Sequence, residues 1–223
     1  MIELNNITKI YEVNKNNKVT ALSEINLKID EGELIVLKGS SGSGKSTILS
    51  LIAALSKPTN GEVIVDGKKI SKLPDNFASV YRRDNIGFIF QKYNLIPALS
   101  VEENILLPLV PLNPDAKVLS QKLEVVMNKF HIEHKKDAIV KNLSGGEQQR
   151  VAIARANVNN PKIIIADEPT ANLDEKLSLH FIEILRELKA LGKTIVVATH
   201  DPLFFNLDFV DREIQVHNGQ LVL

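Results

Sequence analysis

The chain contains no cysteine, and its 27 lysines and arginines are matched by 27 aspartates and glutamates. The absence of cysteine excludes disulfide bonds, thiol chemistry and any metal site built on cysteine ligands. The balanced charge gives no indication of nucleic-acid binding. The chain has 223 residues, 44% of them hydrophobic, which is enough for one domain with a sizeable core.

Long hydrophobic runs are also missing. No apolar run approaches the roughly 18 residues that predict a membrane-spanning helix, and the run at 105–112 is short and interrupted by prolines. The N-terminal stretch alternates polar and apolar residues like a strand and lacks the apolar segment of a signal peptide. We therefore expect a cytoplasmic chain that reaches any membrane through a partner.

Strand patterns at the N-terminus are followed by alternating strand and helix patterns, which predicts an α/β fold. The runs at 162–167 and 193–199 are typical of strands buried on both faces of a sheet. Asp66-Gly67 and Asn218-Gly219 each predict a hairpin turn.

Helical patterns are interleaved with these strands. We predict helices at 45–55 and 175–191, because both show apolar residues at helical spacing. In the second, five apolar residues share one face: Leu177, Phe181, Ile184, Leu188 and Leu191. The stretch from about 97 to 159 has prolines and then helical periodicity, so it differs in texture from the rest.

A glycine-rich stretch follows a predicted strand and opens a predicted helix. It fits the pattern GxxxxGK[ST] and consists of Gly39, Ser40, Ser41, Gly42, Ser43, Gly44, Lys45, Ser46 and Thr47. The glycines let backbone N–H groups point at phosphate oxygens. Lys45 is suited to the β- and γ-phosphates, and the Ser46 hydroxyl to Mg²⁺. This stretch predicts a nucleotide-binding site.

Two adjacent carboxylates, Asp167 and Glu168, end a buried strand pattern. Like charges side by side resist joint ionisation, and Mg²⁺ beside one and a water beside the other would relieve the cost. Asp167 is then the Mg²⁺-side acid, and Glu168 the general base that polarises the attacking water. The alternative is that Asp-Glu-Pro simply ends the strand in a turn.

The stretch LSGGEQQR at 143–150 predicts a second anion site. Ser144, Gly145, Gly146 and Glu147 open a helix, whose first N–H groups lack intrahelical partners. Ser144 with Glu147 three residues later is also a capping box, and both interpretations hold together. One nucleotide has one triphosphate, so this helix start either binds another anion or serves a nucleotide held by another copy.

With these motifs in this order, the whole chain resembles the ATPase subunits of ATP-binding cassette (ABC) transporters. The resemblance implies a P-loop core with a mostly parallel sheet, an N-terminal antiparallel β part and an inserted helical subdomain. It implies one domain over 1–223, with the core at about 1–96 and 160–223 and the helical subdomain at about 97–159. It implies hydrolysis of MgATP by a head-to-tail dimer, in which Ser144, Gly145, Gly146 and Glu147 contact the ATP of the other chain.

Further positions match motifs of that family. Gln91 corresponds to the glutamine that senses Mg²⁺ and γ-phosphate, and His200 to the histidine that contacts the γ-phosphate. Asp174 corresponds to an aspartate at the dimer interface, although it also suits a helix N-cap. Tyr11 corresponds to the aromatic residue that stacks on adenine.

The resemblance also implies an integral membrane partner that contacts the region after Gln91. The segment 92–112 is rich in apolar residues and proline, and we predict that Tyr93 and Leu95 line a groove for a cytoplasmic helix of that partner. The alternative is that both residues pack inside the helical insertion. The partner would hold the chain at the inner face of the cell membrane.

Within the family, the stretches PTNGEVIVDG and ADEPTANLD resemble the lipoprotein-release, macrolide-export and cell-division ATPases. Haem or antimicrobial-peptide export is the alternative. A stand-alone P-loop kinase or GTPase leaves LSGGEQQR without a role, and the guanine-reading [NT]KxD pattern is absent. An ATPase of DNA maintenance predicts a long coiled-coil insertion, for which the chain has no sustained heptads.

Overall fold

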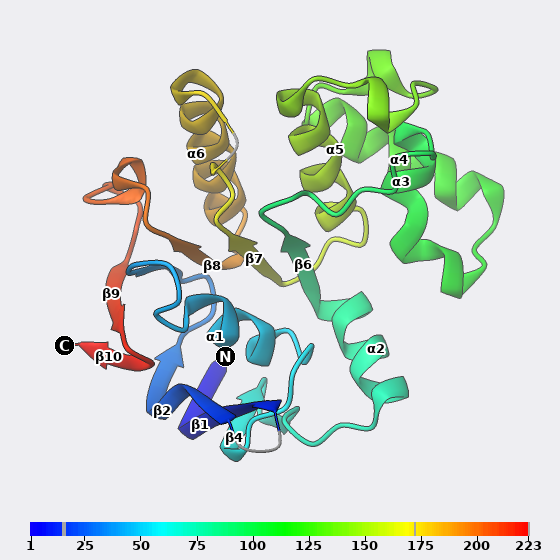
Figure 1. Ribbon diagram of the computed structural model, residues 1–223. Helices are drawn as coiled ribbons and strands as arrows, with labels where there is room; N and C mark the ends of the chain where they lie inside the picture. Colours follow the sequence, from blue (N-terminus) through cyan, green and yellow to red (C-terminus); the bar gives the residue numbers. More distant parts are fainter. Residues whose placement is uncertain (15–16, 172, 223) are drawn as a thin grey trace.

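The structure, a computed structural model, describes residues 1–14, 17–171 and 173–222. Two sheets organise it (Figure 1). The first is antiparallel, with strand order β2-β1-β4-β5: β1 (Ile2–Asn14), β2 (Asn17–Ile29), β4 (Asn60–Val65) and β5 (Lys68–Lys69). The second has strand order β10-β9-β3-β8-β7-β6: β3 (Leu34–Lys38), β6 (Ile86–Ile89), β7 (Ile163–Asp167), β8 (Thr194–Thr199), β9 (Arg212–His217) and β10 (Gln220–Val222).

Every described strand pair in the second sheet is parallel except β9–β10. The predicted α/β class, with an antiparallel N-terminal part and a mostly parallel main sheet, is therefore confirmed. Asp66-Gly67 joins β4 to β5, and Asn218-Gly219 joins β9 to β10, as predicted.

Some helices flank the main sheet, and the others lie in the part of the chain that connects β6 to β7. Outside that interval lie α1 (Lys45–Ile52), α2 (Asp75–Asn85), α6 (Glu175–Ala190) and the short η4 (Pro202–Phe204). Between the two strands lie α3 (Val101–Leu106), η1 (Leu107–Leu112), α4 (Ala116–Lys129), η2 (Glu133–Lys135), η3 (Val140–Asn142) and α5 (Gly145–Asn157). Figure 1 shows α3, α4 and α5 together, away from α1.

Alternation along the parallel strands builds two hydrophobic cores. In β3, Leu34 and Val36 face the core shared with α5 and α6, whereas Ile35 and Leu37 face the core shared with α1 and the antiparallel sheet. The residues of β7 and β8 divide between the same two cores. These strands are buried on both faces, which explains why their sequences are continuous β-branched runs.

Two predicted helix boundaries are wrong. The helix predicted to reach residue 55 ends at Ile52, and Ala54 has a left-handed φ of 50° that no helix can continue. The second predicted helix ends at Ala190, and Leu191 is 62% exposed, so it does not share the apolar face of α6.

Among the described residues, no helix is long and apolar enough to cross a bilayer.

Candidate nucleotide-binding and catalytic site

Four neighbouring strands of the main sheet end beside one another. Their parallel register pairs Lys38 with Thr199, Asp167 with Ala198, and Ile89 with Ala166. The residues that follow β3, β8, β7 and β6 must therefore lie along one edge of the sheet, where open α/β folds bind ligands. This edge brings the predicted loop 39–47 together with Gln91, Glu168 and His200 around a cleft of about 280 Å³.

The glycine-rich loop passes too close to other backbone for side chains at two positions. A Cβ at Gly39 would lie 2.3 Å from the carbonyl oxygen of Val216. A Cβ at Gly44, whose φ is 111°, would lie 2.8 Å from the carbonyl oxygen of Ala21. Gly44 is followed directly by α1, so the loop delivers the first N–H groups of that helix to the cleft.

Lys45 is a buried cation whose partners lie at the cleft. Its side chain is 5% exposed, and Nζ donates to the carbonyl oxygens of Gly39 (2.7 Å) and Ser40 (3.1 Å). The same Nζ lies 3.4 Å from Oε1 of Glu168. The predicted phosphate-binding cation and the predicted base are thus an ion pair in this structure.

Ser46 and Asp167 form a hydroxyl–carboxylate pair at the mouth of the loop. Ser46 Oγ donates to Asp167 Oδ1 at 2.9 Å. Burial raises the pKa of Asp167 above its usual range; the Ser46 hydrogen bond opposes that shift, and the neighbouring charge of Glu168 adds to it. A divalent cation beside this carboxylate would favour its ionised form, and hydroxyl and carboxylate oxygens are ligands that suit Mg²⁺.

Glu168 is held by contacts to both of its carboxylate oxygens. Its backbone has a left-handed φ of 43°, and its N–H donates to the carbonyl of Ala198 at 2.8 Å. Oε2 lies 2.9 Å from His200 Nδ1 and accepts from the hydroxyl of Thr199 at 3.2 Å. Sequence reasoning missed Thr199; its position directly before His200 at the end of a buried strand was the available signal.

The structure brings most of the predicted nucleotide contacts to the cleft. Its lining includes residues Ser41, Gly42, Ser43, Gly44, Lys45, Ser46, Thr47, Gln91, Glu168 and His200. Gly39 and Ser40 contribute through their carbonyls to Lys45. Tyr11 is 40% exposed and does not line the cleft; its cross-strand partner Val19 does.

The residues present fit a bound nucleotide with Mg²⁺. Ser43 Oγ is buried and has no hydrogen-bond partner among the described residues, so a phosphate oxygen would satisfy it. Backbone N–H groups, the buried Lys45 and the Ser46–Asp167 pair supply donors, charge and hard oxygen ligands.

The start of α5 is a complete capping box. The backbone N–H and hydroxyl of Ser144 both donate to Glu147 Oε2 at 2.8 Å, and the N–H of Glu147 donates to Ser144 Oγ at 3.4 Å. With Lys135 3.1 Å from the other carboxylate oxygen, these contacts lower the pKa of Glu147 to about 2, the Ser144 backbone N–H being the largest cause. Both carboxylate oxygens of Glu147 therefore have partners within the chain, Oε2 at its own helix start and Oε1 on Lys135.

The paired glycines of α5 differ in their surroundings. A Cβ at Gly145 would meet no atom within 4 Å, whereas one at Gly146 would lie 2.9 Å from the side chain of Leu177. Ser144 and Gly145 are exposed, and none of 144–147 lines the cleft. Within one chain, therefore, this second predicted anion site is separate from the first.

Two further residues complete the picture around these motifs. Asp174 caps α6 by accepting from the N–H of Leu177 at 2.8 Å. The buried Gln149, which sequence reasoning did not single out, donates from Nε2 to the carbonyl of Pro169 at 3.1 Å. Gln149 thereby joins α5 to the segment that carries Glu168.

Comparison with known proteins places these motifs in one family. The model of the ABC transporter family matches residues 22–171. An ABC transporter ATP-binding protein of Methanocaldococcus jannaschii, MJ0796, is 44% identical over 227 residues, covering 99% of this chain and 95% of its own length. A dimeric solved structure of MJ0796 in a post-hydrolysis state, bound to ADP and phosphate, matches with a TM-score of 0.92 and 41% identity, covering 100% of this chain and 97% of that one.

Relatives with assigned transport roles differ in direction. The methionine import ATP-binding protein MetN of Haemophilus influenzae is 42% identical, covering all of this chain and 64% of MetN. The macrolide export protein MacB of Campylobacter jejuni, an ATP-binding and permease chain, is 40% identical, covering all of this chain and 34% of MacB.

The fold, the cleft and these matches define an ATP-binding cassette. The chain belongs to the ABC transporter family and is an ATPase of that family.

Proposed function

We propose that the protein hydrolyses MgATP in a head-to-tail homodimer and drives a separate membrane subunit with that reaction. The observation that carries the proposal is the separation of two complementary sites on one chain. The cleft supplies Lys45, Asp167 and Glu168, whereas the exposed Ser144 and Gly145 open another helix elsewhere. Head-to-tail pairing would place each helix start over the cleft of the other chain.

In this proposal ATP occupies the cleft with its phosphates against the loop 39–47. Lys45 turns from Glu168 to the β- and γ-phosphates, which leaves Glu168 free to accept a proton from water. The water oxygen then bonds to the γ-phosphorus, the bond to the ADP oxygen breaks, and phosphate and ADP leave with no covalent intermediate. His200, 2.9 Å from Glu168, orients the base and contacts the γ-phosphate.

Mg²⁺ would be held by Ser46 and Asp167 together with Gln91, which lines the same cleft. When bound, the ion neutralises charge on the phosphate oxygens. Tyr11 remains our candidate for stacking on adenine, because it pairs with the cleft-lining Val19 across β1 and β2. Asp174 remains our candidate for the dimer interface next to the start of α6.

For domain organisation, we propose a helical subdomain at about 97–159 within a core of about 1–96 and 160–223. For the transport role, we propose an export or lipoprotein-release system. The sequence resemblance to that branch supports it, and MacB is a relative with that direction, although MetN is an importer. The membrane subunit would hold the chain at the inner face of the cell membrane.

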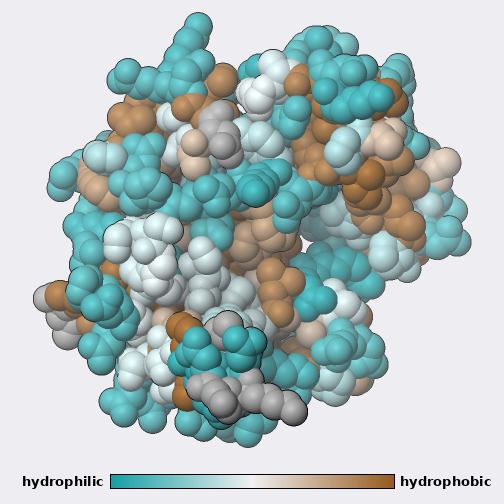
Figure 2. Space-filling model, viewed as in Figure 1, coloured by the Kyte–Doolittle hydropathy of each residue, from teal (hydrophilic) through white to brown (hydrophobic). Residues whose placement is uncertain are grey.

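The membrane subunit would dock on the segment after Gln91, but the structure corrects which side chains are available. Tyr93 is only 8% exposed, and Leu95 packs against the hydrophobic core. The same segment contributes instead to two open cavities, and Figure 2 shows hydrophobic side chains gathered over this helical part at the upper right.

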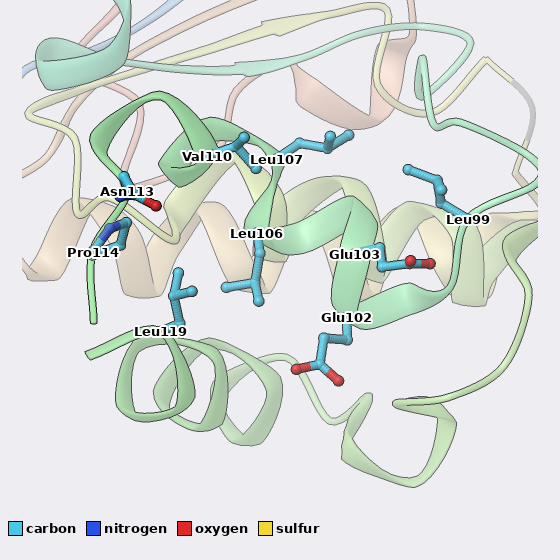
Figure 3. A pocket seen from close by; sticks show the side chains of 9 residues that line it. All are labelled: Leu99, Glu102, Glu103, Leu106, Leu107, Val110, Asn113, Pro114 and Leu119. Atoms are coloured by element: carbon cyan, nitrogen blue, oxygen red, sulfur yellow. The ribbon is translucent and has the colours of Figure 1, made fainter. Parts of the chain in front are cut away.

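One cavity is a groove of about 380 Å³ between α2, β6 and η1, lined by Val80, Phe90 and Pro108 among others. The second, of about 480 Å³, lies between α3, η1 and α4, where Leu106 and Leu119 point toward one another (Figure 3). We propose the groove as the docking site for a cytoplasmic helix of the membrane subunit. Phe90 lines the groove and directly precedes Gln91, so a movement of Gln91 would also shift the contact with that helix.

Two experiments test the function as a whole. Specific ATPase activity of the soluble protein should rise with protein concentration, since each site needs two chains. Purification of the tagged protein from detergent-solubilised membranes should recover an integral membrane subunit, identified by mass spectrometry. In vesicles that carry this complex with the ATPase on the outside, added ATP should move cargo away from the ATPase, into the lumen. Concentration-independent turnover would refute the shared site, and transport toward the side of the ATPase would refute the export role.

A further inference from the structure

Arg155 is a guanidinium without a carboxylate partner among the described residues. It lies near the end of α5, and its two terminal nitrogens donate to consecutive backbone carbonyls, Nη1 to Asn94 at 2.6 Å and Nη2 to Tyr93 at 2.5 Å. Burial lowers its pKa. The planar fork of arginine can hold two acceptors at once in fixed geometry, which a flexible cation cannot do as well.

The carbonyls that Arg155 holds belong to a strained segment. Tyr93 and Asn94 both have left-handed backbones, with φ of 59° and 48°, which is costly for two consecutive residues other than glycine. The buried Asn104 fixes the far end of this segment, since its side chain accepts from the N–H of Ile96 at 2.8 Å and donates to the carbonyl of Ile96 at 3.1 Å. The path of the chain directly after Gln91 is thus held from the helical side.

The other end of α5 carries Gly145 and Gly146. A helix is stiff, and Arg155 follows Gly146 by nine residues, about 14 Å along the axis at 1.5 Å per residue. In Figure 1 the chain leaving β6 crosses α5 on its way to α3. Gln91 lines the nucleotide cleft of its own chain. Arg155 therefore joins the segment directly after Gln91 to the start of α5, which we propose contacts the nucleotide of the other chain.

We propose that Arg155 is a positioning residue that couples the two nucleotide sites of the dimer. It makes the segment 92–95 and the start of α5 move as one unit, so that occupation of the cleft in one chain sets the position of its Gly145-Gly146 over the ATP of the other. The proposal rests on the composite sites of the proposed function. It assigns no contact between Arg155 and ATP.

Hydrogen exchange of a chain kept monomeric tests this coupling. In a Glu168→Gln, Gly145→Asp background, MgATP should slow amide exchange at 91–95 and also at 146–150. Adding Arg155→Met should preserve ATP binding and the slowing at 91–95 but abolish the slowing at 146–150. Lys189→Met is a control, because Lys189 also donates to a backbone carbonyl, that of Phe209 at 2.5 Å, and pairs with Asp211 at 2.6 Å, outside both sites. It should leave both responses intact.

Arg155→Lys keeps the charge without the fork and should lose part of the response at 146–150; it decides the test if Arg155→Met does not fold. Unchanged slowing at 146–150 in the variant that folds would overturn the proposal, as would the absence of that slowing in the parent. Light scattering on the same samples distinguishes failure of the proposed composite site from failure of the proposed role of Arg155. A dimer in this background would refute the composite site, while the comparison at position 155 would still decide the role of Arg155.

Discussion

Glu168 Oε1 lies 3.4 Å from Lys45 Nζ, and both side chains are largely buried. The proposed base is therefore ion-paired with the cation that must bind the phosphates. A triphosphate entering the cleft competes with Glu168 for Lys45, and it also brings its own negative charge close to that carboxylate. Binding of ATP and release of the base are thus linked through one contact.

Replacing Glu168 by glutamine should separate binding from turnover. The Glu168→Gln protein should bind ATP more tightly than the wild type, because Lys45 is released and a like charge is removed. Turnover should fall by about 10²–10⁴-fold, the usual contribution of a positioned base. Calorimetric titration and phosphate release measure the two effects.

A matched control is Glu213→Gln, which removes another lysine–glutamate pair, Lys38 Nζ to Glu213 Oε2 at 3.0 Å, outside the cleft. It should leave ATP affinity and turnover near those of the wild type. Near-normal turnover of Glu168→Gln would remove Glu168 from the role of base.

Asp167→Asn should stabilise the nucleotide-free protein at neutral pH and weaken its binding of MgATP. Burial makes the pKa of Asp167 higher in the folded chain than in the unfolded chain, so folding favours the neutral acid and penalises the ionised one. The penalty is complete above the raised pKa and absent below the usual aspartate range. The gain in melting temperature should therefore shrink as the pH falls.

Asp208→Asn should change the stability in the opposite direction. A hydrogen bond from Arg186 lowers the pKa of the exposed Asp208, so this substitution should cost a little stability at neutral pH. Melting curves of both variants across the acidic range make the comparison. A destabilised Asp167→Asn protein at neutral pH would contradict the assignment of Asp167 as a partly buried carboxylate whose ionised form is favoured by a bound cation.

Most of the site could be predicted from the sequence, because its functional residues are adjacent to one another at strand ends and helix starts. The loop 39–47 and the pair Asp167-Glu168 lie at the ends of strands whose β-branched runs are readable, and parallel pairing then brings them together. The Ser144–Glu147 capping box was also readable, and the structure contains both of its hydrogen bonds.

Contacts between distant segments were not readable in the same way. Nothing adjacent to Arg155 indicates that it reaches Tyr93, or that Gln149 reaches Pro169. The helix α2 has Phe77, Val80 and Tyr81 at helical spacing, but the rest of it is mostly polar and only Ala78 is buried, so the apolar pattern is short. Tyr93 was expected at a surface groove, but its apolar character is satisfied by burial in the fold.

Substitution of two exposed valines, one in each cavity, tests which cavity binds the membrane subunit. Val80 is 43% exposed in the groove between α2 and η1, and Val110 is 66% exposed in the cavity of Figure 3. Because both side chains are exposed, a glutamate at either position should leave the fold intact. Val80→Glu should weaken recovery of the membrane subunit at least tenfold, equivalent to about 1.4 kcal/mol.

Val110→Glu should leave that recovery unchanged, and the reverse pattern would move the docking site to the cavity between α3 and α4. Recovery is measured by quantitative mass spectrometry of the detergent-solubilised complex. Unchanged recovery with both substitutions would refute docking on the segment after Gln91.

The shared nucleotide site is tested most directly by ATP-dependent dimerisation of Glu168→Gln proteins with a second change at Gly145. A side chain fits at Gly145 without contact, so both Gly145→Ala and Gly145→Asp should fold and bind ATP in their own clefts. Light scattering with MgATP should show a dimer for Glu168→Gln alone and with Gly145→Ala. It should show a monomer with Gly145→Asp, whose carboxylate would face the γ-phosphate of the other chain; a dimer of equal stability with Gly145→Asp would contradict the account.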